Sequence, residues 1–462
     1  MQGKLSTLQL LKSLHFNESV YIVGGALRDN ILGLESKDID LLCLSSGSIT
    51  NVTKQLKQLF KDKISSPFTV GAHPITKMRF KEDVEFKGSF YHCKNVELDI
   101  GQAKGSLIED IRRRDFTINM LAFDLVGKEL LDLSGLALKN IQNKTLNTFP
   151  NVSSENVFKE DPIRILRLFR FSCIYDFSIA PKVEKVLTSC SRLLKEVSPE
   201  RIRTELEKVC IVGKLSQFID LADRYSTLKY FLPEVSSLKG VEQDVYYHSE
   251  GDVFTHTLMV VKNSPKGVIP QLAALFHDVG KPQTQEFFPN EGGASPRIRF
   301  LRHELIGAEL SENILKRLRF DNRTTIKVRT LVKNHLRPLS AEKWSLKAVR
   351  KFCRDLGEET NACLDLAEAD ILSSFNKDGQ LRNNPIPKIR KEIKKQQSTI
   401  KLSPILSGKE IIEALVLNEG PRIGEIKKKL LEWEDEQISL GKTPTKQSAL
   451  TFIKDYLSKL RP

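Results

Sequence analysis

The chain has 462 residues, 40% of them hydrophobic and 28% charged, and its formal net charge at pH 7 is +14. Because single domains usually hold about 100–150 residues, this length predicts several domains. No apolar run approaches the roughly 18 residues of a membrane helix and no signal peptide is recognisable, so we expect no membrane partner. The excess of Lys and Arg favours a polyanionic partner, with a merely basic surface as the alternative. The seven cysteines form no C-x-x-C pair, which predicts reduced thiols and a cytoplasmic protein.

The first candidate site lies between residues 20 and 44. The pattern there predicts a buried strand over 20–23, a Gly24-Gly25 turn, a short helix over 26–32 and a second strand over 39–44. Asp38 and Asp40 lead into that second strand and share a face, because strand side chains alternate. Two carboxylates on one face can bind Mg²⁺, and bare glycines let backbone N–H groups approach a triphosphate near a helix start. A solvated pair of surface aspartates is the alternative.

A third carboxylate follows on a neighbouring strand. Residues 67–100 read as four strands, and the last of them carries Asp99 with Glu97 on the same face. Asp99 is expected to complete a two-metal site with the first pair. The alternative is a surface residue on an edge strand.

Three consecutive arginines, residues 112–114, precede an apolar stretch that contains Asp115 and Asn119. Guanidinium groups bind phosphates through their forked geometry, although a solvated charge run has the same pattern. Asp115 and Asn119 are four residues apart, so on a helix they would share a face. An acid and an amide on one face can bind ribose hydroxyls.

A second arginine-rich segment, residues 160–171, is predicted to be a helix with Pro162 at its first position. Asp161 and Arg164 are near neighbours on it, and together they can offer an acceptor and a donor to a nucleobase edge. The later arginines lie further around the axis and suit phosphates or acidic partners. An amphipathic helix with solvated arginines is the alternative.

In this order, the motifs resemble the class II (bacterial-type) tRNA nucleotidyltransferase/poly(A) polymerase family. The matched patterns are G-G-x-x-R-D from Gly24, D-x-D from Asp38, R-R-D-x-x-x-N from Arg113 and E-D-x-x-R from Glu160. The resemblance covers nearly the whole chain and implies an α+β fold. It implies a polymerase-β-like nucleotidyltransferase head with a mixed sheet, followed by a mostly helical neck, an HD domain and a tail. The implied reaction is addition of C and A to the tRNA 3′ end from CTP and ATP, without a nucleic-acid template.

The resemblance also implies a role for each matched residue. The metals in the head, expected to be Mg²⁺, would be held by Asp38 and Asp40, with Asp99 as the third carboxylate. Ribose would be recognised by Arg114, Asp115 and Asn119, and the base would be selected by Asp161 and Arg164. Positions that contact the nucleotide in this family are matched by Gly24, Gly25, Arg28, Arg167 and Arg170.

The resemblance leaves the added nucleotide open, because CCA-adding, CC-adding and A-adding enzymes and poly(A) polymerases share these motifs. Only twelve residues separate Asp99 from Arg112. The flexible loop that CCA-adding enzymes use to change base is not recognisable there. The glycine-led basic run associated with bacterial poly(A) polymerases is not apparent either.

Five of the eight histidines lie between residues 248 and 335. The order of His256, His277-Asp278 and Asp370 resembles the HD phosphohydrolase pattern, and His and Asp side chains bind transition metals. This resemblance implies that these four residues hold a divalent transition metal. His303 and His335 would then complete a second metal position or bind phosphate. A degenerate, structural HD domain is the alternative.

The chain is therefore predicted to have four parts: a head over 1–146, a helical neck and body over 147–240, an HD domain over 241–380 and a basic helical tail over 381–462. The neck and body would select the nucleotide and bind RNA, and Ser198-Pro199 is expected to begin a neck helix. One rival function is an RNA phosphohydrolase based on the HD domain, and the intact Asp38 and Asp40 argue against it. The other is a non-catalytic RNA-binding protein, which should have lost carboxylates that both sites retain.

Overall fold

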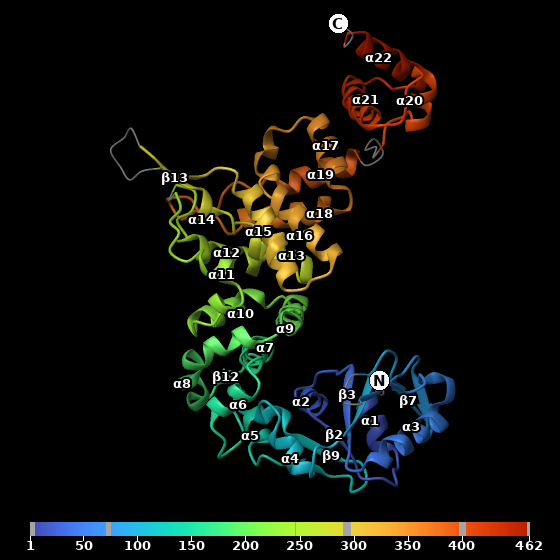
Figure 1. The fold of residues 1–462 in the computed structure, drawn as a ribbon, viewed down its shortest axis with the longest axis vertical. Coiled ribbons are helices and arrows are strands. Elements are labelled where there is room, and N and C mark those ends of the chain that lie inside the picture. Colours follow the sequence, from blue (N-terminus) through green and yellow to red (C-terminus); the bar gives the residue numbers. More distant parts are fainter. Residues whose placement is uncertain (1–4, 71–74, 245, 290–296, 397–402, 460–462) are drawn as a thin grey trace. The chain divides into compact units, whose positions relative to one another are not determined.

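The computed structural model describes residues 5–70, 75–244, 246–289, 297–396 and 403–459 (Figure 1). The chain forms two compact units: Met1–Val197 with Tyr225–Tyr230, and Ser198–Arg224 with Phe231–Pro462. The described helices include none with both the length and the apolar character that crossing a bilayer requires. All seven cysteines are buried, and none of them forms a disulfide, as their unpatterned spacing predicts.

The first unit is built on a seven-stranded mixed sheet. From one edge to the other its strands are β10 (Leu130–Asp132), β9 (Leu121–Asp124), β2 (Val20–Val23), β3 (Asp38–Cys43), β8 (Glu97–Gln102), β5 (Ile75–Arg79) and β4 (Phe68–Val70). The β3–β8 pair is parallel and every other neighbouring pair in this sheet is antiparallel. The alternating burial of β3, whose Ile39 and Leu41 are buried, follows from its alternating apolar and acidic residues.

A smaller sheet joins β1 (Leu5–Ser6), β7 (Ser89–His92) and β6 (Val84–Phe86). The sequence predicts one strand where β6 and β7 form a hairpin. Lys87 and Gly88 make its two-residue turn with φ of +49° and +76°, and the small glycine accepts this conformation readily.

Helices complete the first unit (Figure 1). They are α1 (Thr7–Ser13), α2 (Gly25–Ile31), α3 (Ser46–Phe60), α4 (Leu107–Arg112), α5 (Ala137–Gln142), α6 (Ser154–Glu160), α7 (Arg164–Tyr175) and α8 (Pro181–Cys190). The short strands β11 (Thr145–Leu146) and β12 (Ser178–Ile179) pair in parallel. The prediction that Pro162 occupies the first helical position is wrong: Asp161 and Pro162 form the turn between α6 and α7, and the Arg164 N–H bonds the Asp161 carbonyl at 3.1 Å.

The second unit is almost entirely helical. Its helices before the tail are α9 (Pro199–Val212), α10 (Leu215–Arg224), α11 (Pro233–Ser236), α12 (Val253–Asn263), α13 (Val268–Phe276), α14 (Lys281–Thr284), α15 (His303–Arg317), α16 (Asn322–Asn334), α17 (Leu346–Leu356), α18 (Thr360–Ile371) and α19 (Ile386–Gln396). The hairpin β13 (Gln285–Phe288) and β14 (Arg297–Phe300) interrupts them. The predicted start of the neck helix is confirmed, with Ser198 at the N-cap and Pro199 at the first position of α9.

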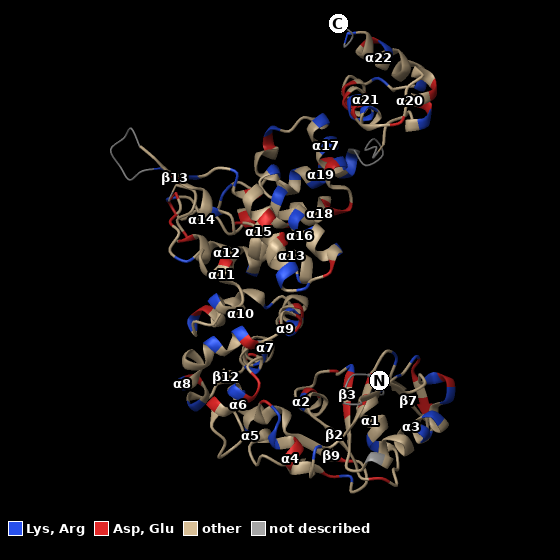
Figure 2. Cartoon of the chain, viewed as in Figure 1, with Lys and Arg blue, Asp and Glu red and all other residues tan. Residues whose placement is uncertain are grey.

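The tail holds α20 (Gly408–Leu415), α21 (Pro421–Ser439) and α22 (Lys446–Ser458). These helices surround their own apolar cluster, which includes Ile411, Leu430 and Ile453. Figure 2 shows that acidic residues are interspersed among the Lys and Arg of these helices. The predicted helical character of the tail is confirmed.

Candidate active and metal sites

Strand register places the predicted carboxylates of the head on one face of the large sheet. In the parallel pair β3–β8, Asp38 lies opposite Glu97 and Asp40 lies opposite Asp99. In the antiparallel pair β5–β8, Lys77 lies opposite Asp99. Side chains at paired positions project from the same face. Asp40, Asp99 and Lys77 therefore lie side by side across three strands. We call the carboxylates Asp38, Asp40 and Asp99 on this face the acidic row.

Asp99 lies in the interior of the sheet, because β8 is flanked by β3 and β5. The alternative of an edge-strand residue is therefore wrong. Lys77 Nζ donates to both carboxylate oxygens of Asp99 at 2.9 Å, and this bonding raises the pKa of Lys77. Arg79 Nη2 lies 3.0 Å from a Glu97 oxygen in the neighbouring row. The negative charges of Asp99 and Glu97 on β8 are therefore neutralised by Lys77 and Arg79 on β5.

A cavity of about 540 Å³ opens beside this face, and Asp40, Asp99 and Arg114 line it. Gly24 has a φ of +77°, and a Cβ on it would lie 2.6 Å from Arg114 Nη1 and 3.2 Å from Asp40 Oδ2. Only glycine lets the backbone come this close to both groups. The Asp40 residue is exposed, but the groups packed around its carboxylate desolvate it and raise its pKa; Arg114 opposes that rise, while Asp99 and Asp38 add to it.

Two residues of this region were missed by the sequence analysis. Asp110 lines the cavity, and its Oδ2 lies 3.8 Å from Arg114 Nη2. The available signal was the four-residue spacing of this acid and base. Lys77 carried only the weaker signal of a basic residue in a strand beside acidic ones.

A buried chain of hydrogen bonds joins the other nucleotide motifs. Asn119 Nδ2 donates to Asp115 Oδ1 at 2.8 Å, and Arg28 Nη1 donates to Asn119 Oδ1 at 2.5 Å. Arg167 Nε donates to Asp115 Oδ2 at 2.8 Å. Burial by itself raises the pKa of Asp115, but Arg167 and Asn119 hold the pKa below its usual value. Residues from α2, α7 and the segment after α4 are thereby held as one network.

The local structure that pairs Asp115 with Asn119 differs from the expected α-helix. The helix α4 ends at Arg112, and Thr117–Asn119 form a separate 3₁₀ turn. The tighter turn still brings the two side chains into contact. Tyr175, which no motif predicted, extends the network: its hydroxyl accepts from Arg28 Nη2 at 2.5 Å and donates to Asp29 Oδ1 at 2.9 Å.

The predicted base-selecting pair lies at the start of α7. Arg164 is 9% exposed, and its guanidinium donates to Val157 O at 3.0 Å, Glu160 Oε2 at 2.7 Å and Arg113 O at 2.6 Å. Asp161 is half-buried in the turn before it. Arg170, also buried, stacks its guanidinium carbon 4.1 Å from the Phe171 ring centre.

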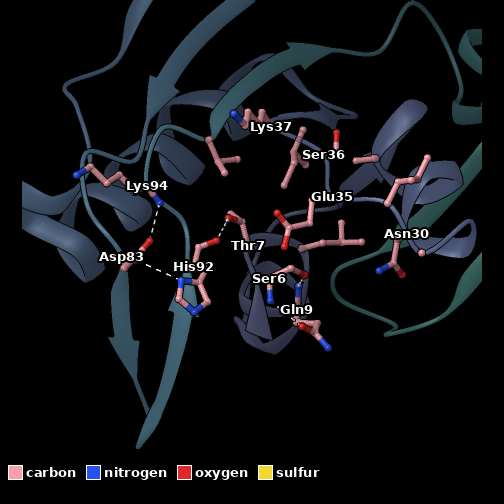
Figure 3. A pocket seen from close by; sticks show the side chains of 16 residues that line it. Ser6, Thr7, Gln9, Asn30, Glu35, Ser36, Lys37, Asp83, His92 and Lys94 are labelled. Carbon is pink, nitrogen blue, oxygen red and sulfur yellow. Dashed lines mark hydrogen bonds and ion pairs between the residues drawn. The ribbon is translucent and has the colours of Figure 1, made fainter. Parts of the chain in front are cut away.

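A second cavity of the first unit, of about 460 Å³, lies on the opposite side of β3, where Ile39 lines it. Figure 3 shows its polar lining, in which Asp83 accepts from the Lys94 backbone N–H at 2.9 Å and lies 3.3 Å from His92 Nδ1. Because Ile39 alternates with the two aspartates, the sheet separates this cavity from the acidic row.

In the second unit, the predicted HD ligands come together among α12, α13 and α18. His256, His277, Asp278 and Asp370 are between 0% and 6% exposed. His277 Nε2 lies 3.1 Å from Asp278 Oδ2, and His256 Nε2 lies 3.2 Å from Asp370 Oδ1. All four predicted ligands therefore face one another.

Three buried atoms of this cluster carry no hydrogen bond among the described residues: His256 Nε2, His277 Nε2 and Asp278 Oδ2. They lie within 4.8 Å of one another. Lys281 Nζ approaches Asp278 Oδ2 at 2.7 Å as an ion pair without hydrogen-bond geometry. Buried polar atoms without partners are costly, and nitrogen and oxygen atoms that converge in this way suit a divalent transition metal.

Glu250, which the sequence analysis missed, orients one of these ligands. Its Oε1 lies 2.8 Å from Nδ1 of both His248 and His256. Burial lowers the pKa of His256, but the neighbouring carboxylates of Asp370 and Glu250 outweigh burial and raise that pKa to about 9. A carboxylate on Nδ1 directs the other ring nitrogen toward the aspartates. The only sequence signal was an acid six residues before His256.

A cavity of about 420 Å³ leads to Asp278 and Asp370, and basic side chains line it, namely Lys281, Arg297, Arg299 and Arg382. Arg297 Nε lies 2.5 Å from Asp244 Oδ2, and its guanidinium carbon lies 5.7 Å from the Tyr247 ring centre. Basic and aromatic groups around buried metal ligands suit a ligand that carries phosphate.

Comparisons with known proteins match three regions of the chain to family models. Residues 20–147 match the family model described as "Poly A polymerase head domain", residues 176–239 match "Probable RNA and SrmB- binding site of polymerase A", and residues 253–374 match "HD domain". The Thermotoga maritima CCA-adding enzyme complexed with tRNA shares the fold with a TM-score of 0.60 at 19% identity, over 97% of this chain and 95% of that one.

Three relatives of known type show to which family the chain belongs. The CC-adding tRNA nucleotidyltransferase of Thermus thermophilus is 28% identical over 94% of this chain and 93% of its own length. The A-adding tRNA nucleotidyltransferase of Deinococcus radiodurans is 27% identical over 95% of each. The multifunctional CCA protein of Herminiimonas arsenicoxydans is 31% identical over 66% of this chain and 70% of its own length. With its acidic row, its nucleotide motifs and its HD cluster in the same order, the chain belongs to the tRNA nucleotidyltransferase/poly(A) polymerase family.

Proposed function

We propose that the protein is a cytoplasmic tRNA nucleotidyltransferase that adds C, A or both to the tRNA 3′ end from CTP and ATP. The observation that carries this proposal is the acidic row, with Asp38 and Asp40 on one exposed face beside Gly24 and Arg114. In the reaction, the tRNA 3′-hydroxyl attacks the nucleotide α-phosphate and pyrophosphate leaves. The oxygen-only set of Asp38, Asp40 and Asp99 fits Mg²⁺. Bound there, Mg²⁺ would supply charge stabilisation at the attacking and leaving oxygens.

The remaining residues would bind and select the nucleotide. Arg114 lies at the cavity, where a guanidinium can neutralise phosphate charge. Asp115 and Asn119 would hold the ribose, supported by Arg28 and Arg167 behind them. Asp161 and Arg164 would read the base edge, because a backbone hydrogen bond of 3.1 Å joins the two residues at the start of α7 and the bonds of Arg164 to Glu160 and Arg113 fix its guanidinium in place.

The choice of nucleotide is tested with three tRNAs, lacking the whole CCA end, the last two nucleotides or only the terminal adenosine. Each is incubated with CTP or ATP singly, and the products are separated at single-nucleotide resolution. A CC-adding enzyme extends the first and the second tRNA with CTP, an A-adding enzyme extends only the third with ATP, and a CCA-adding enzyme does both. Long adenosine tails would favour a poly(A) polymerase. No extension of any tRNA would overturn the proposal.

We also propose that the HD domain is a metal-dependent phosphohydrolase. The three buried atoms of His256, His277 and Asp278 that carry no hydrogen bond among the described residues favour it. A divalent transition metal held there would lower the pKa of a bound water for attack on phosphorus. Arg297 and Arg382 line the approach and would bind the phosphate of the substrate. RNA ends with a cyclic or 2′-phosphate are the substrates to test, after chelation and re-addition of Mn²⁺, Ni²⁺ or Mg²⁺. Absence of both hydrolysis and bound metal would make the domain a structural spacer.

A further inference from the structure

We propose that Tyr246 and Tyr247, with Arg297 near both rings, form a stacking surface for the unpaired end of an RNA strand beside the HD cavity. The inference rests on the proposed phosphohydrolase and names its substrate class, a single-stranded RNA end rather than a free nucleotide. Its basis is the exposure of the two rings, the cations that lie against them and the position of both rings relative to the cavity.

The two tyrosines lie in a turn that fixes their backbone and leaves their rings open. The backbone N–H groups of Tyr246 and Tyr247 donate to Oδ1 and to the carbonyl oxygen of Asp244, both at 3.0 Å. Tyr246 is 43% exposed and Tyr247 is 48% exposed. Because a tyrosine ring has only two side-chain torsions, a base can stack on it at a low cost in entropy. Packing within the domain therefore leaves much of both rings available to a ligand.

Cations from two other segments lie against these rings. The guanidinium carbon of Arg297, on β14, is 5.4 Å from the Tyr246 ring centre and 5.7 Å from the Tyr247 ring centre. From the segment after α18, Lys377 Nζ lies 5.4 Å from the Tyr246 centre, and the Arg382 guanidinium carbon lies 5.7 Å from the Tyr247 centre. Proteins bind single strands by combining rings on which bases stack with cations that pair with the phosphates. Both components are present here.

The charge of this surface favours a polyanion. Apart from the predicted ligands Asp278 and Asp370, Asp244 is the only acid among the described residues that line the cavity, and it is paired with Arg297. Lys377 and Arg382 form no ion pair with any described residue. Their positive charge is therefore available to the phosphodiester groups of a strand.

The position of the tyrosines sets the length of the strand. The cavity of about 420 Å³ is lined by Tyr247 and by Asp278 and Asp370, whereas Tyr246 lies outside its lining. This volume is near the lower end of the range for small-molecule sites, about 300–1,000 Å³, and suits one nucleotide. The terminal nucleotide of a strand would lie beside Tyr247, and the nucleotide before it would stack on Tyr246.

Tyr246 is therefore the residue that distinguishes a strand from other ligands. A free nucleotide fills the cavity and leaves Tyr246 without a base. A duplex keeps its bases stacked inside the helix, so they cannot reach either ring. The surface should accordingly favour RNA ends with at least two unpaired nucleotides.

Crosslinking locates the strand without relying on hydrolysis. The full chain as purified is mixed with a hexanucleotide RNA that ends in a 3′-phosphate and carries 5-iodouridine at its last or its second-last position. The mixture is irradiated, digested and analysed by mass spectrometry. We expect crosslinks to Tyr247 from the last position and to Tyr246 from the second-last, and none to either residue from the same strand in a blunt-ended duplex. Crosslinks confined to other residues, or no crosslinks, would overturn the inference.

Kinetics of Tyr246→Ala then separate a strand from a free nucleotide. The variant should lower kcat/KM for a hexanucleotide with a 2′,3′-cyclic phosphate end by about 5- to 100-fold, because one stacked base is lost. It should leave kcat/KM for a nucleoside 2′,3′-cyclic phosphate unchanged. Tyr246→Phe keeps the ring and should retain the wild-type values. Phe287→Ala is the matched control, since Phe287 is an exposed ring on β13 outside the cavity lining.

The two experiments distinguish failure of the inference from failure of the proposed hydrolysis. If Tyr246→Ala lowers kcat/KM equally for both substrates, or for neither, the inference is overturned and the phosphohydrolase stands. If the unchanged chain hydrolyses neither substrate while crosslinks form at both tyrosines, the proposed phosphohydrolase fails and the strand-binding surface stands. Circular dichroism checks the folding of each variant.

Discussion

The head and the HD domain hold their candidate metal ligands in opposite ways. In the head, Asp38 and Asp40 are exposed oxygen ligands, and Lys77 neutralises their neighbour Asp99. In the HD domain the ligands are buried, include imidazoles and leave three atoms without hydrogen bonds. Exposed carboxylates are satisfied by water when no cation is present, whereas buried lone pairs are not. We therefore expect the head to exchange its cations readily and the HD domain to retain its metal through purification.

The largest effect should come from the acidic row. Asp38→Ala or Asp40→Ala should lower nucleotide addition by about 10³-fold or more, because bound cations supply several kcal/mol of transition-state stabilisation. Binding of tRNA and hydrolysis by the HD domain should persist. Single-turnover incorporation of labelled CTP and ATP, with filter binding of tRNA, measures both effects. Glu97→Gln is the matched control, since Glu97 shares the face but is paired with Arg79. Near-normal turnover in either aspartate variant would falsify the catalytic assignment.

Substitution of the HD ligands should have the opposite effect, namely loss of hydrolysis with nucleotide addition retained. His277→Ala or Asp278→Ala should remove both the retained metal and phosphoester hydrolysis, while nucleotide addition is unchanged. After chelation, Mg²⁺ alone should restore the head at once, whereas hydrolysis should require the transition metal. Elemental analysis and both activity assays on the same preparations test this. If these variants lost nucleotide addition as well, the metal sites of the head and the HD domain would not be independent of each other.

The next largest effect should be on the choice of base after substitution of Asp161 or Arg164. Asp161→Ala or Arg164→Ala should lower discrimination against UTP and GTP by about 10- to 100-fold, because a base edge needs a donor and an acceptor at fixed places. Values of kcat/KM for the four nucleotides give the ratio. Arg164 is buried and bonded to two backbone carbonyls. The thermal stability of Arg164→Ala must therefore be measured together with its kinetics. Unchanged preference for CTP and ATP in both variants would show that other residues select the base.

The sequence predicts the local parts of both sites well. The strand over 20–23 and the shared face of Asp38 and Asp40 depend on alternation within a few residues, and both are present. The HD ligands also lie together as predicted, because α12, α13 and α18, which carry or directly precede them, pack against one another.

What the sequence does not predict is pairing between distant strands and helices. Strand order places Asp99 between β3 and β5 and pairs it with Lys77. Tyr175 meets Arg28 across 147 residues. No local pattern encodes either contact, because alternation gives the face of a residue but not the neighbour opposite it.

The contact between Lys77 and Asp99 provides a test of whether Asp99 is a metal ligand. The pair is partly exposed, so it is worth about 0.4–1 kcal/mol, and a cation that binds Asp99 must replace it. Lys77→Met should therefore lower the half-saturating Mg²⁺ concentration for nucleotide addition by about two- to fivefold. Arg79→Met, which removes the ion pair of Arg79 with Glu97 instead, is the control and should leave the half-saturating Mg²⁺ concentration unchanged. An unchanged Mg²⁺ dependence in Lys77→Met would remove Asp99 from the metal ligands.

The smallest expected effect concerns Tyr175. Burial raises the pKa of its hydroxyl to about 12, so the group stays protonated and donates to Asp29 throughout the assay range. Tyr175→Phe should lower the free energy of unfolding by about 1 kcal/mol. Tyr225→Phe should cost a similar amount, because the Tyr225 hydroxyl bonds Glu184 at 2.6 Å in the same unit.

Only Tyr175→Phe should also raise the KM for the nucleotide, by a few-fold, because its hydroxyl bonds Arg28, and Arg28 in turn bonds Asn119. Urea unfolding and steady-state kinetics on both variants separate stability from positioning. If both variants changed the KM equally, the effect would come from lost stability alone. If neither changed it, the network would stabilise the first unit without positioning Asn119 for the ribose. A rise in Tyr175→Phe alone would assign a positioning role to a residue that lies outside every sequence motif.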